Sequence, residues 1–174
     1  MALHVALLRA INVGGRTVKM DALRTICEEM GLTKVETFIA SGNVIFESRA
    51  GAAALEKKIE AHLRKVLGYE VATFVRSVPA LAAAVAHCES LLRNGEGAHV
   101  GFLKAPVGRD AQTRVREFEN KDERFAFHGR EIYWLTRSGI GESKFSNAVF
   151  ERLIKSPATF RNVTTVRKLA EKYA

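Results

Sequence analysis

Two glycine-rich loops contain the residue types that could bind an anion. The first reads INVGGR at residues 11–16, and the second reads RSGIGESK at residues 137–144. Glycines let backbone N–H groups approach a ligand closely, and a helix N-terminus after such a loop favours negative charge. Neither loop has the GxGxxG spacing or the Walker spacing GxxxxGK[ST]. The chemistry that they indicate is therefore anion binding, with no nucleotide class specified.

The first candidate site joins the loop at 12–16 to a predicted hairpin turn near residues 41–43. Alternating strand directions in a βαββαβ unit place this loop and this turn at the same end of the sheet. The candidate anion ligands here are Arg9, Asn12, Gly14, Gly15, Arg16, Ser41 and Asn43. The alternative is that the glycines only allow a positive φ in tight connections.

The second candidate site joins the loop at 139–147 to the end of a later strand. A helix is predicted to start near Ser143 or Lys144, with Lys144 as the counter-charge for a phosphate. The candidate ligands are Gly141, Ser143, Lys144, Asn147, Arg161 and Asn162. Glu142 argues against an anion because a carboxylate would repel it. A plain N-cap role for Ser143 is the alternative.

Other chemistry has little support in the sequence. There is no HExxH, GxSxG or CxxC motif, so neither a metal site nor a cofactor is expected. The two cysteines, Cys27 and Cys88, are expected to be buried thiols. Tyr133 and Trp134 could stack on RNA bases, but neighbours on a strand point to opposite faces and one of them is expected in the core.

The composition restricts the class of partner. The chain of 174 residues carries 27 basic and 19 acidic residues, a formal net charge of +8. This balance permits a phosphorylated metabolite or a nucleic acid as partner. No apolar run approaches the roughly 18 residues of a membrane helix, so no membrane association is expected and a cytoplasmic location is the default. Nothing in the sequence determines the oligomeric state.

The hydrophobic pattern alternates between strands and helices in each half of the chain. In the first half, strands are predicted at 3–10, 35–41, 44–48 and 70–76, and helices at 20–30, 55–67 and 79–92. In the second half, strands are predicted at 99–105, 124–128, 131–136 and 158–162, and helices at 109–119, about 144–153 and 166–173. Gly42–Asn43 and Gly129–Arg130 each predict a two-residue hairpin.

The two halves also share letters. HVALLRA at 4–10 matches HVGFLKA at 99–105, an offset of 95. Gly42 and Ile45 match Gly129 and Ile132 at an offset of 87, ATF at 72–74 returns at 158–160 at 86, and Arg76 matches Arg161 at 85. We therefore predict an α+β fold that is a tandem duplication of two ferredoxin-like βαββαβ units, each followed by an extra helix. The repeats are placed at residues 1–93 and 98–174, and they could form one compact domain.

Several motifs resemble one bacterial family. They are ALLRAINVGG at 6–15, SGNVIFES at 41–48, FVRS at 74–77, GIGESKFSN at 139–147 and ATFRNVTTVRKL at 158–169. These are similar to the domain of unknown function 1697, and the resemblance runs nearly from end to end. It implies an α+β fold of two ferredoxin-like halves, and it implies no activity.

The function expected from these observations is non-catalytic binding of a phosphorylated small molecule or a nucleic acid. One alternative is an enzyme that acts on a small anionic substrate. Another is a protein–protein interaction module that uses an exposed sheet edge. Because the first strand continues into INVGGR and its repeat into APVG, the loop of the first repeat is expected to be the better candidate for a binding site.

Overall fold

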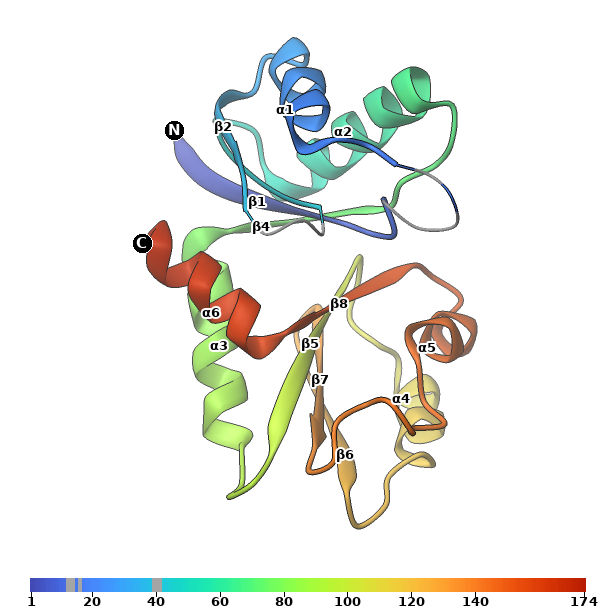
Figure 1. The fold of residues 1–174 in the computed structure, drawn as a ribbon. Helices are drawn as coiled ribbons and strands as arrows, with labels where there is room; N and C mark the ends of the chain where they lie inside the picture. Colours follow the sequence, from blue (N-terminus) through green and yellow to red (C-terminus); the bar gives the residue numbers. More distant parts are fainter. Residues whose placement is uncertain (12–14, 16, 39–41) are drawn as a thin grey trace. The chain divides into compact units, whose positions relative to one another are not determined.

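The computed structural model describes residues 1–11, 15, 17–38 and 42–174, and these form two compact units. The first unit comprises Met1–Ala80 with Tyr173–Ala174, and the second comprises Leu81–Lys172. Each unit contains a four-stranded antiparallel sheet with helices (Figure 1). The predicted α+β class with two similar halves is therefore confirmed. The repeat boundaries at 1–93 and 98–174 stay a prediction about the sequence.

The first unit has a sheet with strand order β2-β3-β1-β4. Its strands and helices are β1 (Ala2–Leu8), α1 (Met20–Glu29), β2 (Thr33–Thr37), β3 (Asn43–Ser48), α2 (Ala52–Leu67) and β4 (Thr73–Ser77). Helices α1 and α2 lie on one face of the sheet (Figure 1). On α2, Leu55, Ile59 and Leu63 recur every four residues, so they form one apolar stripe that is buried against the sheet.

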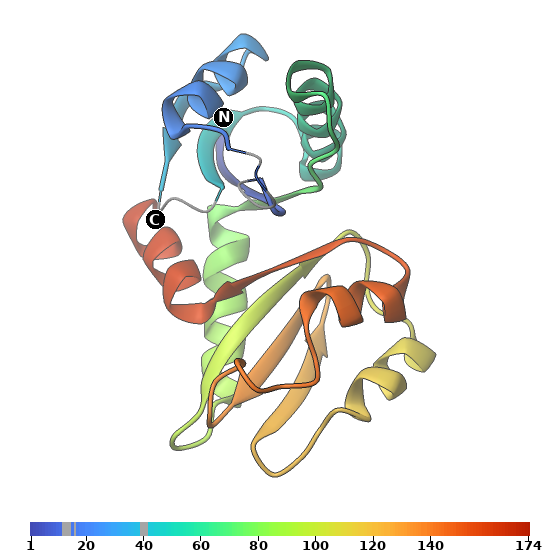
Figure 2. The same ribbon diagram turned by 45° about the vertical axis from the view of Figure 1, so that its right-hand side comes forward.

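The second unit repeats this topology with strand order β6-β7-β5-β8. Its elements are α3 (Val78–Leu91, from Leu81 on), β5 (Gly97–Leu103), α4 (Arg109–Arg116), β6 (Glu123–His128), β7 (Glu131–Thr136), α5 (Asn147–Ile154), β8 (Ala158–Asn162) and α6 (Val163–Lys172). Helices α4 and α5 cover one face of the sheet, and α3 and α6 lie on the other (Figures 1 and 2).

The strand register shows which residues of the two units are equivalent. In β1, Ala6 lies opposite Val44 and Val75, and in β5 Gly101 lies opposite Ile132 and Phe160. The last strands are therefore related by an offset of 85, and β3 and β7 by 88. The identical letters at offsets of 86 and 87 therefore align residues that are one position away from their structural equivalents. Side chains alternate between the two faces of a strand, so only the register seen in the structure keeps the same face buried in both units.

The two hairpins differ in length. In the second unit, His128 pairs with Glu131, so the predicted two-residue turn at Gly129–Arg130 is confirmed. In the first unit, β2 ends at Thr37, and the Phe38 N–H donates to the Asn43 carbonyl at 3.1 Å. The strand predicted at 35–41 therefore ends at Thr37 within the described residues, and its residues 39–41 lie outside them. The hydrogen bond between Phe38 and Asn43 spans more residues than the two of the predicted Gly42–Asn43 turn.

Glutamate side chains satisfy the outer edge of the first unit's sheet at β4. The Thr73 N–H donates to a Glu60 carboxylate oxygen at 3.2 Å, and the Val75 N–H donates to Glu56 at 3.0 Å. Both glutamates come from α2, four residues apart, so they project from one side of the helix. Glu56 is buried and also lies 3.7 Å from the Arg76 guanidinium.

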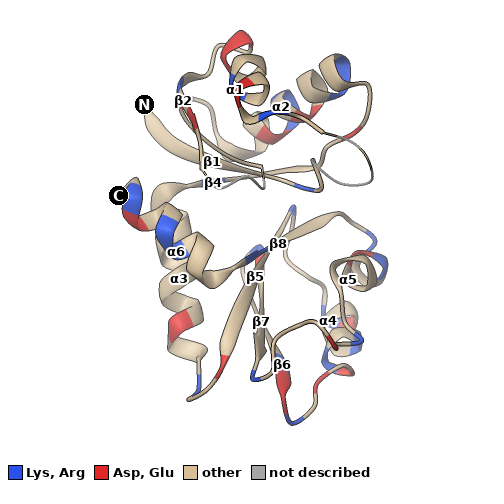
Figure 3. Cartoon of the chain, viewed as in Figure 1, with Lys and Arg blue, Asp and Glu red and all other residues tan. Residues whose placement is uncertain are grey.

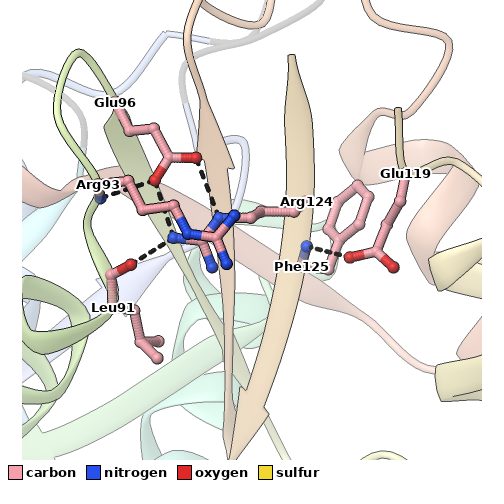
Figure 4. A network of polar contacts seen from close by, with 6 residues as sticks. All are labelled: Leu91, Arg93, Glu96, Glu119, Arg124 and Phe125. Atoms are coloured by element: carbon pink, nitrogen blue, oxygen red, sulfur yellow. Dashed lines mark hydrogen bonds and ion pairs between the residues drawn. The ribbon is translucent and has the colours of Figure 1, made fainter. Parts of the chain in front are cut away.

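The edges of the second sheet are covered in the same way. On β6, the Phe125 N–H donates to Glu119 at 3.0 Å (Figure 4). Arg116 donates to the Phe125 carbonyl at 3.0 Å. On β8, the Ala158 N–H donates to Glu151 of α5 at 2.8 Å. A strand edge whose N–H groups are satisfied by side chains is a poor template for another strand. The structure gives no support at these positions to a partner that adds a strand.

Arg124 holds the connection between α3 and β5 (Figure 4). Its guanidinium donates to the carbonyl of Leu91, the last residue of α3, and to both carboxylate oxygens of Glu96, at 2.8 and 3.0 Å. The Arg93 N–H donates to Glu96 at 2.8 Å. The hydrogen bond from Arg124 lowers the pKa of Glu96. One side chain thus caps a helix end and fixes the turn that follows it.

No helix in the described part of the chain has the length and apolar character needed to span a membrane.

Candidate anion-binding site

At the first candidate site, the end of β1 and Gly42 meet at one end of the first sheet. The Leu8 N–H donates to the Gly42 carbonyl at 2.9 Å. Gly42 has φ +79°, and a Cβ built on it would lie 3.0 Å from Ile11 Cγ2. The end of β1 and the hairpin between β2 and β3 are therefore packed together, as the topology predicts.

Three ligands predicted for this site fall within the described residues. Arg9 is half-buried, and its backbone N–H donates to the Ala72 carbonyl at 2.9 Å. Gly15 is exposed with φ +82°, so it allows the chain to turn here. Asn43 is fully buried, and its side-chain amide donates to the Phe38 carbonyl at 3.0 Å, which holds the hairpin. Asn12, Gly14, Arg16 and Ser41 lie outside the described residues.

The predicted helix start near Ser143 or Lys144 is wrong. Helix α5 begins at Asn147, and the N-cap is Ser146, whose hydroxyl accepts from the Val149 N–H at 3.1 Å. The Ser143 hydroxyl instead donates to Glu123 at 2.7 Å and accepts from the Phe145 N–H at 3.0 Å. The N–H of Gly141 therefore does not lie at a helix N-terminus, because the chain needs five more residues before the helix begins.

Lys144 lies in an acidic environment. It lines a hollow of about 510 Å³ between the end of α4 and the loop after β7. Four carboxylates share the lining, from Glu117, Glu119, Glu123 and Glu142. Because four negative charges surround one positive charge, a phosphate would be repelled here. The repulsion of a phosphate that is expected from Glu142 therefore applies to the whole hollow.

The side chains of Arg161 and Asn162 form hydrogen bonds within their own unit that stabilise the fold. Arg161 donates to the Thr159 hydroxyl at 2.7 Å and to the Phe160 carbonyl at 3.1 Å, and burial lowers its pKa to about 10. Phe160 packs beneath α4 and α5, so its neighbour Arg161 points to the opposite face of the sheet. The Asn162 side chain accepts from the Thr164 N–H at 2.9 Å and caps α6.

The remaining predicted ligand, Asn147, also has a structural contact. Its amide donates to the carbonyl of Ala158 at 3.1 Å and joins the start of α5 to the start of β8. The structure therefore does not bring Lys144 and Arg161 to one anion site, since the hollow at Lys144 lies on the α4 side of the sheet. The predicted ligands Ser143, Asn147, Arg161 and Asn162 instead form contacts that join loops, helices and strands.

A cavity that the sequence reasoning missed lies at the other end of the second sheet. It has a volume of about 450 Å³ and is formed by the loop from β5 to α4, the first turns of α4 and the end of α5. Its lining contains three basic side chains, Lys104, Arg109 and Arg114, and one carboxylate, Asp110. The three cations exceed the single carboxylate by two charges, so the cavity attracts anions.

The local sequence explains how the basic groups are placed. Lys104 directly follows β5, and it corresponds to Arg9 after β1 at the repeat offset of 95. Gly108 is the N-cap of α4 in extended conformation, and no side chain of the cap accepts from the first turn. Gln112 donates to the Val107 carbonyl at 3.0 Å and holds the loop against the helix. The match of Arg9 to Lys104 was the signal that could have found this site.

Arg109 and Arg114 extend from α4 into solvent at the rim of the cavity. Both are exposed, and within the described ranges neither guanidinium forms an ion pair. Basic residues are visible along α4 and near the end of α5 in Figure 3. A guanidinium that is not engaged by a carboxylate keeps its five donors available for a phosphate oxygen.

The lining of the cavity is rich in groups that can bind an anion. Among the residues that line it, Lys104, Asp110 and Ser156 are the groups that could take part in proton transfer or nucleophilic attack, and the lining contains no histidine or cysteine. In the described part of the chain, no group of three or more His, Cys, Asp or Glu side chains could hold a metal ion. Cys27 and Cys88 are buried, which raises the pKa of their thiols to about 12 and about 11.

Base stacking on the second sheet is not available. Tyr133 is 1% exposed and Trp134 is 3% exposed, although they point to opposite faces. Trp134 packs among Phe125 and Phe145 beneath α4 and α5, and Tyr133 packs near His87 of α3. The prediction that one of these rings is in the core is confirmed, and the structure buries the other as well.

Comparisons with known proteins agree with this architecture. The sequence profile of the family described as "Protein of unknown function (DUF1697)" matches residues 1–133. The solved structure of a conserved bacterial protein from Streptococcus pneumoniae is similar, with a TM-score of 0.75 and 27% sequence identity. The similarity covers 99% of this chain and 98% of that one. A search of curated proteins finds no match.

Proposed function

The chain belongs to the DUF1697 family of proteins of unknown function, and we propose that it binds a phosphorylated small molecule in the cavity at the start of α4, without transforming it. The observation that carries this proposal is the set of three basic side chains, Lys104, Arg109 and Arg114, around one cavity. The N-cap of α4 offers no side-chain acceptor, so the first N–H groups of the helix add to the attraction for an anion.

The size of the cavity favours a small molecule over a nucleic acid. Its volume of about 450 Å³ lies within the usual range of about 300–1,000 Å³ for small-molecule sites. A nucleic-acid strand needs a longer basic groove together with aromatic platforms for its bases. Trp134 and Tyr133 cannot supply such a platform because both rings are buried.

The test is a binding titration with inorganic pyrophosphate and AMP as probes. The variant R109A/R114A removes two exposed cations at the cavity, and we expect it to lose at least about tenfold in affinity, since each charge-assisted contact contributes about 1.5–3 kcal/mol. The matched control is K121A/R137A, which removes two exposed cations of the same unit that do not line the cavity.

Three outcomes are informative. A loss of affinity in R109A/R114A together with unchanged binding in K121A/R137A supports the proposal. Equal losses in both variants would mean that net charge alone binds the probes, which overturns it. A short RNA that binds more tightly than AMP, with an affinity that falls steeply with salt, would assign the basic surface to nucleic acid instead.

A further inference from the structure

The walls of the cavity in the second unit differ in chemistry. On the α4 side, the lining is basic, with Arg109 and Arg114 at the rim. Leu153 and Ile154, in the last turn of α5, also line the cavity, together with Val107 of the loop that precedes α4. These three apolar side chains are half-buried, so each keeps part of its surface open.

Such an arrangement favours a ligand that combines an anionic group with an apolar body. The charged wall attracts an anionic group, and the apolar wall gains free energy when apolar surface covers it. A ligand whose body is covered with hydroxyl groups, such as a sugar phosphate, would have to place those groups against Leu153 and Ile154 without hydrogen-bond partners. Such burial of unpaired polar groups is unfavourable.

We infer that the ligand is a phosphomonoester with an apolar body, with its phosphate at Arg109 and Arg114 and its body against Leu153 and Ile154. This inference rests on the proposed function and specifies the class of molecule that the same cavity binds. Residues that line one cavity contact both ends of the ligand. The phosphate lies at the exposed rim, where water can solvate it, and the apolar body fills the space between α4 and α5.

The first experiment uses the unmodified protein and a series of ligands. Inorganic phosphate, methyl phosphate, butyl phosphate and hexyl phosphate carry the same head group on apolar bodies of increasing length. We expect the affinity to rise by about fourfold for each added methylene until the apolar wall is covered, given the usual gain of about 0.8 kcal/mol per buried CH₂. Glucose 6-phosphate should bind more weakly than hexyl phosphate.

The second experiment places the apolar contact on α5. I154S should reduce the gain from methyl to hexyl phosphate and leave the affinity for inorganic phosphate unchanged. The matched control is I140S, because Ile140 is an exposed isoleucine of the same unit that does not line the cavity. Trp134 fluorescence checks that both variants keep the fold of the unit, and the ligand series on the unmodified protein does not depend on either variant.

The outcomes separate this inference from the proposed function. If inorganic phosphate binds but chain length has no effect, or glucose 6-phosphate binds as tightly as hexyl phosphate, the inference is overturned and the proposed function stands. If no phosphate compound binds, both are overturned. If I154S and I140S reduce the gain equally, the apolar contact does not lie at α5 and the inference is overturned.

Discussion

The two units share a topology and a register, but they fill their cores with different side chains. Beneath α1 and α2, the buried core is mainly aliphatic, with Phe46 as its aromatic member. Beneath α4 and α5, aromatic rings dominate the core, and Trp134 and Phe145 pack edge to face with centroids 4.9 Å apart. The repeat has therefore kept the backbone arrangement while the packing of side chains has changed.

One pair of positions shows how such a change is compensated. Gly101 in β5 is equivalent to Ala6 in β1, and Phe160 in β8 is equivalent to Val75 in β4. A Cβ on Gly101 would lie 2.5 Å from Ile132 Cγ2 and 2.7 Å from the Phe160 ring. Ile132 and the Phe160 ring, on the two neighbouring strands, together leave no room for a side chain on Gly101, because interiors are close-packed.

The units also differ in how an arginine of the last strand is held. In the first unit, Arg76 is 3% exposed and lies 3.7 Å from the Glu56 carboxylate. In the second unit, the equivalent Arg161 donates to the hydroxyl of Thr159. The glutamate that satisfies β8, Glu151, is half-exposed. Glu151 is the counterpart of Glu60, which accepts from the equivalent Thr73 N–H and is also partly exposed. The buried Glu56 of the first unit accepts from the next outward-facing N–H, that of Val75, and pairs with Arg76.

The largest expected effect comes from E56A. It removes the carboxylate from a buried pair and leaves the Arg76 charge and the Val75 N–H without this acceptor, at a cost of about 3–5 kcal/mol in the free energy of unfolding. The comparison variant E151A in the second unit removes the acceptor of the Ala158 N–H at a half-exposed site and should cost about 1–2 kcal/mol. Urea unfolding followed by circular dichroism measures both, and equal losses would contradict the contrast between the units.

G101A should cost about 1–3 kcal/mol, because its methyl group overpacks the aromatic core. F160V alone should cost about 2–3 kcal/mol by leaving a cavity. The double variant G101A/F160V copies the combination of the first unit and should lose less than the sum of the two by at least about 1 kcal/mol. G97A in the same strand is the control, since nothing lies within 4 Å of its Cβ. Additive losses would show that the two positions are not coupled. Trp134 fluorescence during urea unfolding follows this unit.

The second unit begins with α3, and Arg124 binds the end of this helix. R124A should destabilise the unit by about 2 kcal/mol, because Glu96 and the carbonyl at the end of α3 lose their charged donor. R124K keeps the charge but loses the two-point contact, and it should recover part of the loss. Since the pKa of Glu96 is lowered in the folded state, this stabilisation is present at neutral pH and is lost as pH falls below about 4.3, the ordinary value of a glutamate.

The difference in unfolding free energy between the wild type and E96Q should therefore shrink on acidification. A gap that stays constant from pH 7 to pH 3 would mean that the Glu96 charge does not contribute. Urea midpoints at each pH, read by Trp134 fluorescence, provide the measurement.

The smallest expected effect is a pH dependence in the second unit. His87 and His128 stack with ring centroids 4.3 Å apart, and burial together with the neighbouring His128 lowers the pKa of His87. Stability is then fully present above about pH 6.5 and falls as pH decreases through the folded value. H128Q should lose less stability than the wild type between pH 7 and pH 5, by a fraction of a kcal/mol. Identical profiles in thermal unfolding would contradict this.

Much of the architecture could be predicted from local patterns. Strands such as β1 and β5 are short apolar runs bounded by turn residues, and α2 has a clear period of four, so periodicity identifies them. The predicted start of α5 was wrong because two serines could each serve as its N-cap. Ser146 caps the helix, whereas the Ser143 hydroxyl donates to Glu123 of strand β6, a contact that local sequence does not indicate.

The candidate site was predicted less well, because it depends on packing between segments far apart in the chain. The glycine-rich loop at 137–144 has the composition of an anion site, but the tertiary structure surrounds Lys144 with glutamates from the segment after α4, from β6 and from the loop itself. The short APVG loop has an unremarkable composition, and the cavity appears there because α5 ends opposite the start of α4.

The sequence by itself determined the order of strands and helices, the duplication and the excess of basic residues. These properties depend on residue type and spacing along the chain, which periodicity and repeat offsets report directly. Only the tertiary structure decided the register between strands, the pairing of Gly101 with Phe160, and the meeting of Arg109 and Arg114 with Leu153 and Ile154. Those features follow from the volumes and directions of side chains that become neighbours only when the chain is folded.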